Sequence, residues 1–433
     1  MSGDTRSMAR LAATSLVGAS IEWFDFYLYG VAAALVFPTL YFPKDMPSYI
    51  SVLASLSTYA VGFVARPFGA VVFGHVGDRL GRKAALTVAW VVMGVATALI
   101  GLLPGYAVIG VAAPAALVLL RCVQGLAIGG QWGGAMLLVV ESAPPERRGF
   151  YGSFAQVGAP AGVVLANLAF VIIDRFTDHD SFIAWGWRLP FLLSAGLVGL
   201  AWYIHKRIEE TAEFKAVERT LGSEARRSPI RDALVNHPKR VLLAAGAFLA
   251  VQVSFYIAIQ FVVVWGSNTD FGLSMPKSTL LTAVMCSSAV MAPSLLYSGR
   301  LSDRFGRRRI YLWGAALTAV WAFVMFPLIE TKQPFLIFLA IVGSTTINGL
   351  MYGPQAALFG ELFPASVRYS GASLGYQLGA AFGGGFAPLI ATWILDVTHG
   401  TTWVSVYIAA ASLITIGSVL AIGSRREMDG GNV

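Results

Sequence analysis

Residues Gly74 to Lys83 read GHVGDRLGRK, and residues Gly299 to Arg309 read GRLSDRFGRRR. Both stretches keep the order Gly-x-x-x-Asp-Arg-x-Gly-Arg, and each lies between long apolar segments. A short segment with this density of charge is expected to be a loop in water between two membrane spans. Its repetition predicts a chain built from two related halves.

The composition is that of an integral membrane protein. Of the 433 residues, 56% are hydrophobic and 12% are charged, and the mean hydropathy is +0.68; soluble domains carry about 25% charged residues. The apolar runs are continuous rather than alternating, which favours helices over a β-barrel. The net charge of +8 falls in loops rather than along one stripe, so no nucleic-acid partner is expected.

Two smaller signals agree with this class. Cys122 and Cys286 lie in apolar stretches of different halves, so they are expected to be free packing residues. The apolar run that follows Arg10 continues to about Phe42, far beyond the ~7–15 residues of a signal-peptide core. We therefore expect an uncleaved first span.

Apolar windows of about 20 residues predict twelve helices. The expected fold class is an all-α polytopic membrane protein with twelve transmembrane helices in two pseudo-symmetric six-helix bundles. The spans cover 12–40, 48–73, 84–103, 106–140, 150–173, 187–207, 241–266, 277–298, 310–329, 334–360, 371–395 and 403–423.

One long polar segment separates the sixth span from the seventh. Residues 206–240 hold nine Lys/Arg and six Asp/Glu, and the stretch EETAEFKAVERTL at 209–221 has the pattern of a solvent-facing helix. The predicted domains are an N-terminal bundle over 1–205, a linker over 206–240 and a C-terminal bundle over 241–433.

The positive charges predict the orientation. Placing both termini, the linker and the even-to-odd loops on one side gathers 24 of the 31 Lys/Arg residues there. By the positive-inside rule this side is cytoplasmic. We expect a multi-pass protein of the cell membrane, the inner membrane in a bacterium, that is surrounded by lipid and is monomeric, with both termini in the cytoplasm.

The first predicted helix carries two acids. Glu22 and Asp25 are three residues apart and share a helical face with Tyr29. A charge in mid-span costs about 2.5–3.5 kcal/mol on insertion scales, so these acids should face a wet or protein-lined interior. Because burial disfavours the charged form of a carboxyl, Asp25 is the candidate proton carrier and Glu22 its partner. The alternative is a structural ion pair with Arg66 or Arg121.

Arg121 lies in the fourth predicted helix, with Gln124 and Gln131 on its face. A guanidinium group can donate two parallel hydrogen bonds to a carboxylate, so Arg121 is a candidate ligand for a carboxylate substrate. Arg66 lies in the cytoplasmic half of the second helix. It could pair structurally with Glu22 or Asp25 or contact the substrate, and the sequence favours neither role.

Glycines recur at every fourth residue in two helices, which predicts close helix packing. The first run is Gly125, Gly129 and Gly133, and the second is Gly371, Gly375, Gly379 and Gly383.

The halves repeat in more than the charged stretch. Gln156 and Gln377, like Glu141 and Glu361, recur roughly 220 residues apart. Parallel duplication of six-helix units places a substrate path between the halves, near the bilayer midplane.

The repeated charged stretch resembles the major facilitator superfamily motif between helices two and three, which has a degenerate copy between helices eight and nine. Three stretches are similar to the metabolite:proton symporter family within it, namely GASIEWFDFYLYG at 18–30, ARPFGAVVFGHVGDRLGRK at 65–83 and LLRCVQGLAIGGQWGGA at 119–135. That family includes transporters for shikimate, α-ketoglutarate, citrate, and proline with betaine. The resemblance covers essentially the whole chain. It implies alternating-access transport of a small polar metabolite with protons, and it ties Arg121 to proton coupling.

In the family, helices seven, ten and eleven line the cavity, which favours neutral polar residues of the second half as ligands. Packing against neighbouring helices is the alternative for any one of them. The candidate substrate contacts are Arg121, Arg66, Tyr29, Gln124, Gln131, Trp132, Gln156, Tyr256, Gln260, Tyr352 and Gln377.

The charged helix ends form a candidate cytoplasmic gate. Asp78 is expected to cap the start of the third helix, and its loss should impair transport while sparing substrate affinity. A purely topological role is the alternative for Arg82 and Lys83. The gate candidates are Gly74, Asp78, Arg79, Gly81, Arg82, Lys83, Glu141, Arg147, Asp303, Arg304, Arg307 and Glu361.

The leading hypothesis is proton-coupled symport of a small organic acid, such as shikimate or a dicarboxylate. A zwitterionic osmolyte, held by aromatic rings, is the rival substrate. A transporter-like receptor is a remote alternative. No enzyme, metal or cofactor is expected: GASLG at 371–375 matches a nucleophile elbow only in letters, and no two His residues have metal-ligand spacing.

Overall fold

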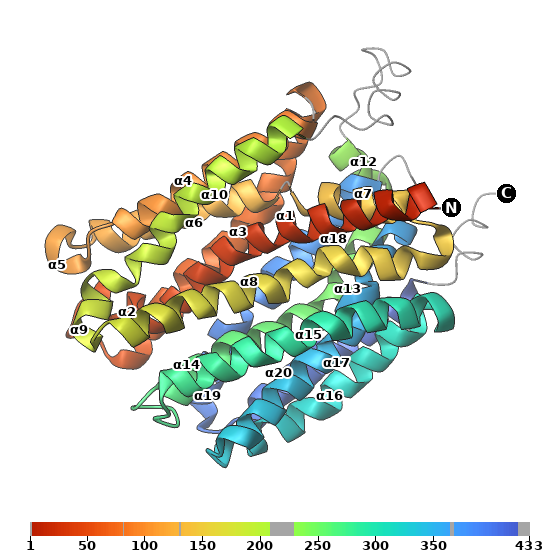
Figure 1. Ribbon diagram of the computed structural model, residues 1–433. Helices are drawn as coiled ribbons and strands as arrows, with labels where there is room; N and C mark the ends of the chain where they lie inside the picture. Colours follow the sequence, from red (N-terminus) through yellow and green to blue (C-terminus); the bar gives the residue numbers. More distant parts are fainter. Residues whose placement is uncertain (1, 81, 130, 208–228, 364–367, 423–433) are drawn as a thin grey trace.

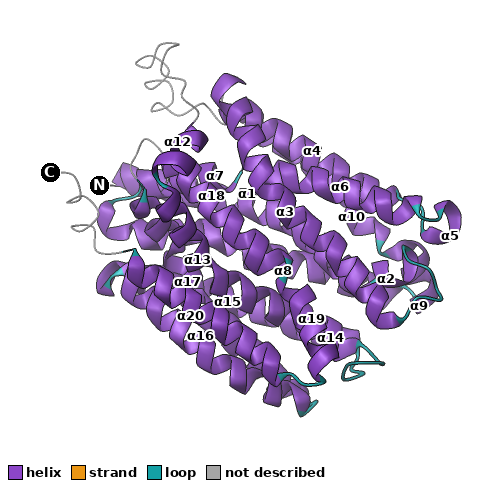
Figure 2. Cartoon of the chain, turned by 180° about the vertical axis from the view of Figure 1, so that it is seen from behind, coloured by secondary structure: helices purple, strands orange, loops and turns teal. Residues whose placement is uncertain are grey.

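The computed structural model describes residues 2–80, 82–129, 131–207, 229–363 and 368–422, and every structural statement below refers to these ranges. Within them the chain forms helices joined by short loops, and no strand is present (Figure 2). The stretch 209–221, predicted to be a solvent-facing helix, lies outside these ranges.

The N-terminal half, as the term is used here, comprises α1 to α10. Its long helices are α1 (Ser2–Leu35), α3 (Ser48–Leu80), α4 (Arg82–Leu102), α6 (Ala112–Gly129), α7 (Trp132–Ser142), α8 (Arg148–Phe176) and α10 (Arg188–Arg207). Short elements join them: α2 (Phe37–Leu40), α5 (Tyr106–Ile109), η1 (Pro145–Arg147), α9 (His179–Ser181) and the π-helical η2 (Phe182–Gly186).

The C-terminal half comprises α13 to α20 and follows α12 (Pro229–Asn236), which lies in the predicted linker. Two of its spans contain π-helical turns, η3 (Ile257–Phe261) and η4 (Ala381–Gly385). The remaining elements are α13 (Pro238–Tyr256), α14 (Val262–Ser267), α15 (Lys277–Phe305), α16 (Arg307–Glu330), α17 (Pro334–Leu362), α18 (Arg368–Ala380), α19 (Ala387–Thr398) and α20 (Thr402–Ala421).

Each predicted span is occupied by helix. Among the described residues, nine helices are long and apolar enough to cross a membrane by length and composition. The three other predicted spans lie in α1, where Glu22 and Asp25 fall within the span, in α4 and in α10. Large apolar side chains such as Phe68, Trp313 and Leu413 are more than half exposed, as a surface in contact with lipid requires. The protein is a multi-pass helical membrane protein.

The stretch Gly74–Lys83 differs from its prediction as a loop. Helix α3 continues to Leu80 and α4 begins at Arg82, so most of the stretch is helical. In the second copy, Gly306 alone separates α15 from α16, at a φ of 92° that glycine adopts readily. Arg and Lys are good helix formers, so the helices extend past the apolar segments.

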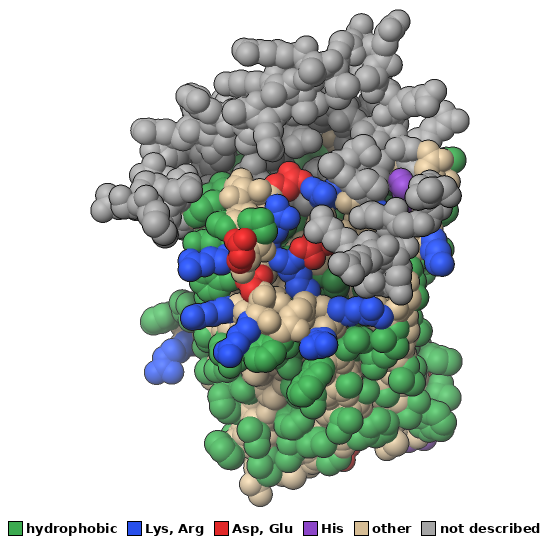
Figure 3. Space-filling view, turned by 90° about the vertical axis from the view of Figure 1, so that its right-hand side faces the viewer, with side chains coloured by type: hydrophobic (Ala, Val, Ile, Leu, Met, Phe, Trp, Pro, Cys, Tyr) green, Lys and Arg blue, Asp and Glu red, His purple; other side chains and the backbone are tan. Residues whose placement is uncertain are grey.

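The two halves lie side by side, and the long helices of each run along a shared direction (Figure 1). The start of α1 and the end of α20 lie at the same end of the molecule, called the terminal side below. Across the interface α8 packs against α15 and α17, and α3 packs against α18, η4 and α19. Charged side chains gather near the terminal side, above a largely hydrophobic flank (Figure 3).

Both glycine runs lie at close helix contacts, as predicted for the members that the structure describes. A Cβ at Gly125 would lie 2.8 Å from the Ala65 Cβ, so α6 packs directly on α3. A Cβ at Gly379 would lie 2.8 Å from the Phe248 Cβ, so α18 packs directly on α13. The first of these contacts brings the two buried arginines of the N-terminal half together.

Candidate substrate and proton-coupling site

Arg66 of α3 and Arg121 of α6 are buried in the middle of the molecule, with 1% and 0% of their surfaces exposed. The Arg66 Cζ lies 4.1 Å from the ring centroid of Phe26 and 4.3 Å from that of Phe63. The Arg121 Cζ lies 4.2 Å from the Tyr29 ring and 4.5 Å from the Phe26 ring. Both guanidinium groups therefore rest on aromatic faces, and they share Phe26.

Neither guanidinium group is fully paired. The Nε and Nη2 atoms of Arg66 and of Arg121 are buried and find no hydrogen-bond acceptor among the described residues. No ion pair within 4.0 Å joins either arginine to Glu22 or Asp25 in the described ranges. The structural ion pair considered above is therefore not found here. A buried donor without a partner costs about 1–3 kcal/mol, more when charged, so these atoms suit an anionic ligand.

Asp25 is held by hydroxyl groups from two other helices. It is 2% exposed; its Oδ1 accepts a hydrogen bond from Ser194 Oγ at 2.5 Å, and its Oδ2 accepts one from Thr97 Oγ1 at 3.4 Å. Thr97 Oγ1 in turn accepts from Gln124 Nε2 at 2.7 Å, and Gln124 Oε1 accepts from Arg121 Nη1 at 3.0 Å. A buried chain of hydrogen bonds thus connects Asp25 with Arg121.

Glu22 has a different environment. It lies one helical turn before Asp25, is partly exposed and interacts electrostatically with Arg66. Glu22 and Asp25 are therefore distinct: Asp25 is held by hydrogen bonds and buried, whereas Glu22 is partly exposed.

The C-terminal half adds Tyr256 to the aromatic rings around the arginines. This cluster, called the aromatic chamber below, consists of Phe26, Tyr29, Tyr59, Phe63 and Tyr256. The Tyr256 ring lies 5.3 Å from Phe63, 6.2 Å from Tyr59 and 6.1 Å from Tyr27. A Cβ at Gly385 would lie 2.7 Å from the Phe63 Cβ, so the backbone of η4 approaches α3 closely. The π-helical turns η3 and η4 both border this chamber, and such turns are frequent at functional sites.

Three of the predicted glutamines donate hydrogen bonds to the backbone of the opposite half. The bonds are Gln260 Nε2 to Gly30 O at 3.4 Å, Gln377 Nε2 to Gly129 O at 3.3 Å and Gln156 Nε2 to Tyr352 O at 3.4 Å. Gln131 is also buried, and both atoms of its amide lack a partner within the described part of the chain.

An aromatic stack lies between the chamber and the terminal side. The rings of Trp132 and Tyr376, from opposite halves, are 3.7 Å apart at an angle of 17°. Tyr376 also stacks on Phe248 at 4.3 Å, and Tyr352 lies 6.3 Å from Phe248. Because Trp132 follows Arg121 by about three helical turns, this layer separates Arg121 from the terminal side.

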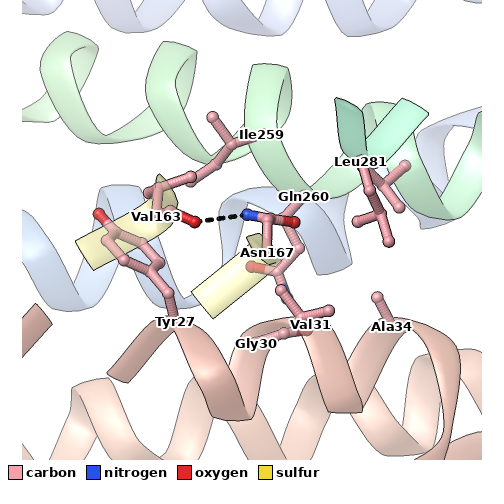
Figure 4. A pocket seen from close by; sticks show the side chains of 10 residues that line it. Tyr27, Gly30, Val31, Ala34, Val163, Asn167, Ile259, Gln260 and Leu281 are labelled. Atoms are coloured by element: carbon pink, nitrogen blue, oxygen red, sulfur yellow. Dashed lines mark hydrogen bonds between the residues drawn. The ribbon is translucent and has the colours of Figure 1, made fainter. Parts of the chain in front are cut away.

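A pocket lies between the halves on the opposite side of the chamber (Figure 4). Tyr27 and Gly30 of α1 face Asn167 of α8 and Gln260 of η3 across it. Asn167 donates to Val163 O at 2.8 Å, while its buried Oδ1 lacks a partner among the described residues. Both halves therefore contribute an amide to this pocket.

The gate candidate Asp303 accepts two hydrogen bonds from the backbone of the other half. Its Oδ1 accepts from Gly149 N at 2.8 Å and its Oδ2 from Phe150 N at 2.9 Å. Asp303 thus caps α8, a helix of the other half, rather than the helix that follows it. Arg307 pairs with Asp303 at 3.6 Å and with Glu361.

Glu141 and Arg368 form a second bridge between the halves, with Nη1 and Oε1 3.1 Å apart. Two other predicted gate residues, Arg147 and Arg304, are exposed; the Arg304 Cζ lies 5.2 Å from the Phe305 ring. For five further gate candidates the structure describes only the backbone: Gly74, Asp78, Arg79, Arg82 and Lys83. Gly81 lies outside the described residues.

Sequence reasoning missed Thr97 and Ser194, because single hydroxyl residues are common in membrane helices and usually bond their own backbone. It also missed the aromatic chamber. Tyr59, Phe63 and Arg66 follow one another at spacings of four and three, so they share a helical face, and this signal was available.

The fold and the site define a class: a multi-pass helical protein of two halves with buried charges where they meet. The sequence pattern of the Major Facilitator Superfamily matches residues 15–376 and 268–431. The chain belongs to this superfamily and is a membrane transporter, not an enzyme. The predicted superfamily and twelve-helix fold are confirmed.

Several relatives match nearly the whole chain. The chain is 39% identical over 423 residues to the inner membrane metabolite transport protein YhjE of Escherichia coli (strain K12), covering 97% of this chain and 95% of the relative. It is 39% identical over 418 residues to the shikimate transporter of the same strain, covering 96% and 94%. It is 30% identical to the glycine betaine/proline/ectoine/pipecolic acid transporter OusA of Dickeya dadantii (strain 3937), covering 95% and 82%.

A solved structure shares the fold. The partially occluded inward open conformation of the xylose transporter XylE from E. coli superposes with a TM-score of 0.69 at 17% identity, covering 95% of this chain and 96% of that chain.

Proposed function

We propose that this protein is a proton-coupled symporter of a small organic acid in the inner membrane, with both termini and the 206–240 linker in the cytoplasm. The observation that carries the proposal is the pair of buried, incompletely paired guanidinium groups on the interface between the halves. A carboxylate could accept two hydrogen bonds from one guanidinium, and such bidentate pairs are the strongest that arginine forms.

Asp25 is the proposed proton carrier. It is buried and is the carboxylate that hydrogen bonds connect to Arg121. Uptake of one proton with a monoanionic acid moves no net charge, so the membrane potential does not drive it. Each further proton carries one positive charge inward, and the potential then contributes about 2.3 kcal/mol per 100 mV. Glu22, which is partly exposed, is the proposed partner of Asp25 in proton transfer.

The chamber supports recognition of a ring or short chain. Tyr29, Tyr256 and Trp132 provide aromatic surface from both halves, and Gln131 offers an amide without a partner in the described ranges. Gln156, Gln260 and Gln377 now hold the halves together; when the halves move apart, these amides become available to the substrate. The relatives that transport shikimate and other metabolites support this substrate class.

A zwitterionic osmolyte is the second candidate, because one relative transports betaine and proline and the chamber is rich in aromatic rings. Two guanidinium groups would repel its cationic end, so we favour the acid.

The proposal is tested by uptake into vesicles that contain the purified protein. Radiolabelled shikimate, short dicarboxylates, proline and betaine are offered with and without an imposed inward proton gradient. We expect an acid to accumulate above equilibrium only with the gradient. Accumulation of betaine or proline alone would select the second candidate, equilibration without accumulation would indicate uniport, and no uptake at all would support a receptor.

Asp25→Asn is expected to abolish gradient-driven accumulation, because the amide cannot carry a proton through the cycle. Exchange of internal for external substrate should continue, since it needs no proton release. Glu22→Gln, at the proposed partner of Asp25, should lower the accumulation without abolishing it. Uphill uptake by Asp25→Asn at the wild-type level would contradict the role of Asp25.

A further inference from the structure

We propose that Thr97 and Gln124 are positioning residues that relay the protonation state of Asp25 to Arg121, with Ser194 holding the other oxygen of the carboxylate. Proton uptake at Asp25 would then loosen Arg121 and make its guanidinium available to the substrate anion. The relay rests on the proposed function, because it assumes that Asp25 carries the transported proton.

The direction of every hydrogen bond in the chain follows from its two ends. Arg121 can only donate, so Gln124 must present Oε1 to it and turn Nε2 toward Thr97. Thr97 Oγ1 therefore accepts from Gln124, and its single hydrogen points elsewhere. A carboxylate at Asp25 can only accept, so all donors in the chain point from Arg121 toward Asp25.

Both hydroxyl groups that hold Asp25 have a second acceptor within reach. Thr97 Oγ1 lies 2.9 Å from Met93 O, closer than its 3.4 Å from Asp25 Oδ2, so its hydrogen is shared between the two acceptors. Ser194 Oγ lies 2.5 Å from Asp25 Oδ1 and 3.4 Å from Pro190 O. Each alternative is a carbonyl one turn earlier on the same helix. Either hydroxyl can therefore turn away from Asp25 without leaving a buried donor unpaired, which would cost about 1–3 kcal/mol.

Protonation of Asp25 changes what the chain can do. The new carboxyl O–H is a donor, so the Thr97 hydrogen bonds Met93 O alone while Thr97 Oγ1 accepts from Asp25. The negative charge that oriented the donors is then neutralised. The electrostatic attraction between Asp25 and Arg121, at the other end of the hydrogen-bond chain, is therefore lost. Reciprocally, an anion bound to Arg121 must favour the protonated state of Asp25 by the same factor.

The ionisable groups around this chain come from four helices, while α4 and α10 contribute the hydroxyl groups of Thr97 and Ser194. They are Glu22, Tyr27 and Tyr29 on α1, Arg66 and Tyr59 on α3, Arg121 and Cys122 on α6, and Tyr256 on α13. Glu22 is the carboxyl in this set besides Asp25, so the relay is tested in a Glu22→Gln background as well.

The experiment measures KM for the radiolabelled acid that the wild type accumulates, beginning with shikimate, over about pH 5–8. The assay is counterflow exchange without a gradient, in vesicles that contain the whole protein. In the wild type we expect KM to rise with pH by at least about fivefold, the lower end of typical coupling factors. Thr97→Val removes the hydroxyl at nearly constant volume and should flatten this change to less than about twofold.

Two further variants separate positioning from folding. Thr97→Ser keeps the hydroxyl and should restore the wild-type slope. Thr392→Val is the matched control, because Thr392 is also fully buried and bonds only Pro388 O, one turn earlier, in the described structure; its slope should be that of the wild type. If Thr97→Val does not fold, Gln124→Leu tests the next bond and should give the same flat profile.

The outcomes are distinguishable. A wild type that accumulates no acid with a proton gradient refutes the proposed function itself. A wild type with pH-dependent KM whose slope survives in both Thr97→Val and Gln124→Leu refutes the relay alone. A flat slope in Thr97→Val that Thr97→Ser does not restore also counts against the relay, because it would reflect a packing defect.

Discussion

Arg121 is positioned by a residue without a side chain. Gly62 of α3 lies under the guanidinium, and a Cβ there would come within 3.0 Å of the Arg121 Cδ and Cζ. On the other side the group rests on Tyr29 and Phe26. The guanidinium therefore packs between these two rings and Gly62, and it fits there because Gly62 has no Cβ.

Gly62→Ala should displace the Arg121 guanidinium and weaken its bond with a carboxylate. A hydrogen bond to a charged group contributes about 1.5–3 kcal/mol, so we expect KM for uptake to rise about tenfold or more, with less effect on the maximal rate. Gly18→Ala is the control, since a Cβ at Gly18 meets no atom within 4 Å. An unchanged KM in Gly62→Ala would show that Arg121 does not contact substrate.

At this scale the sequence predicted the charged residues but not their connections. Asp25 and Arg121 were identifiable because a charge inside a membrane span is expensive and rare. Their link through Thr97 and Gln124 depends on the relative rotation of three helices, which no local pattern reports. Ser194, far along the chain, was missed for the same reason.

At the scale of single helices, the apolar runs predicted every span, because the bilayer demands about 20 apolar residues of each. Helix ends were less predictable. The thickness of the bilayer determines the length of the apolar segment, but the backbone hydrogen bonds of the helix can continue beyond that segment into water. The π-helical turns η3 and η4 carry no sequence signal that we recognised, since one inserted residue leaves the apolar character unchanged.

The N-terminus of α8 is an element whose stability depends on the other half. Asp303→Asn removes the charge from a cap that accepts two backbone N–H groups of α8, and caps contribute about 0.5–2 kcal/mol. We expect the terminal side to open more often, by roughly 2- to 30-fold.

This opening is measured by thiol labelling at Ser153→Cys, because Ser153 is fully buried beside Gly299. The background is Cys122→Ser with Cys286→Ser, which removes both native thiols. Arg304→Gln, a charge change at an exposed residue of the same turn, is the control and should leave the labelling rate unchanged. Equal rates in the Asp303→Asn and wild-type backgrounds would rule out the cap as a latch.

At the scale of the whole molecule, contacts between the halves lie on both sides of the chamber. Glu141–Arg368 and Asp303 with α8 join them on the terminal side, and Asn268 Nδ2 lies 3.4 Å from Ser48 Oγ on the other. The internal duplication, visible in the sequence, predicted two halves that meet. Which acid bridges to which helix required their relative placement, which is why the cap on α8 was not foreseen.

The Glu141–Arg368 pair offers a test of this interface by charge exchange. Glu141→Arg alone should slow uptake, because it places two like charges across the halves. Since the pair is partly exposed, its contribution is about 0.2–1 kcal/mol, and the effect should be only a fewfold change in rate. Glu141→Arg combined with Arg368→Glu should recover most of the wild-type rate; a double variant no faster than the slower single one would argue against the bridge.

The position of Phe26 between the two arginines has a consequence for the size of the cargo. Each guanidinium carbon is fixed relative to the same ring, at 4.1 Å and 4.5 Å from its centre, so the two cations cannot be farther apart than the sum of these distances. The Phe26 ring therefore sets an upper limit on the distance between the two positive charges. A compact acid can lie against both charges at once, whereas a long-chain diacid must leave one end without a cation until the ring moves.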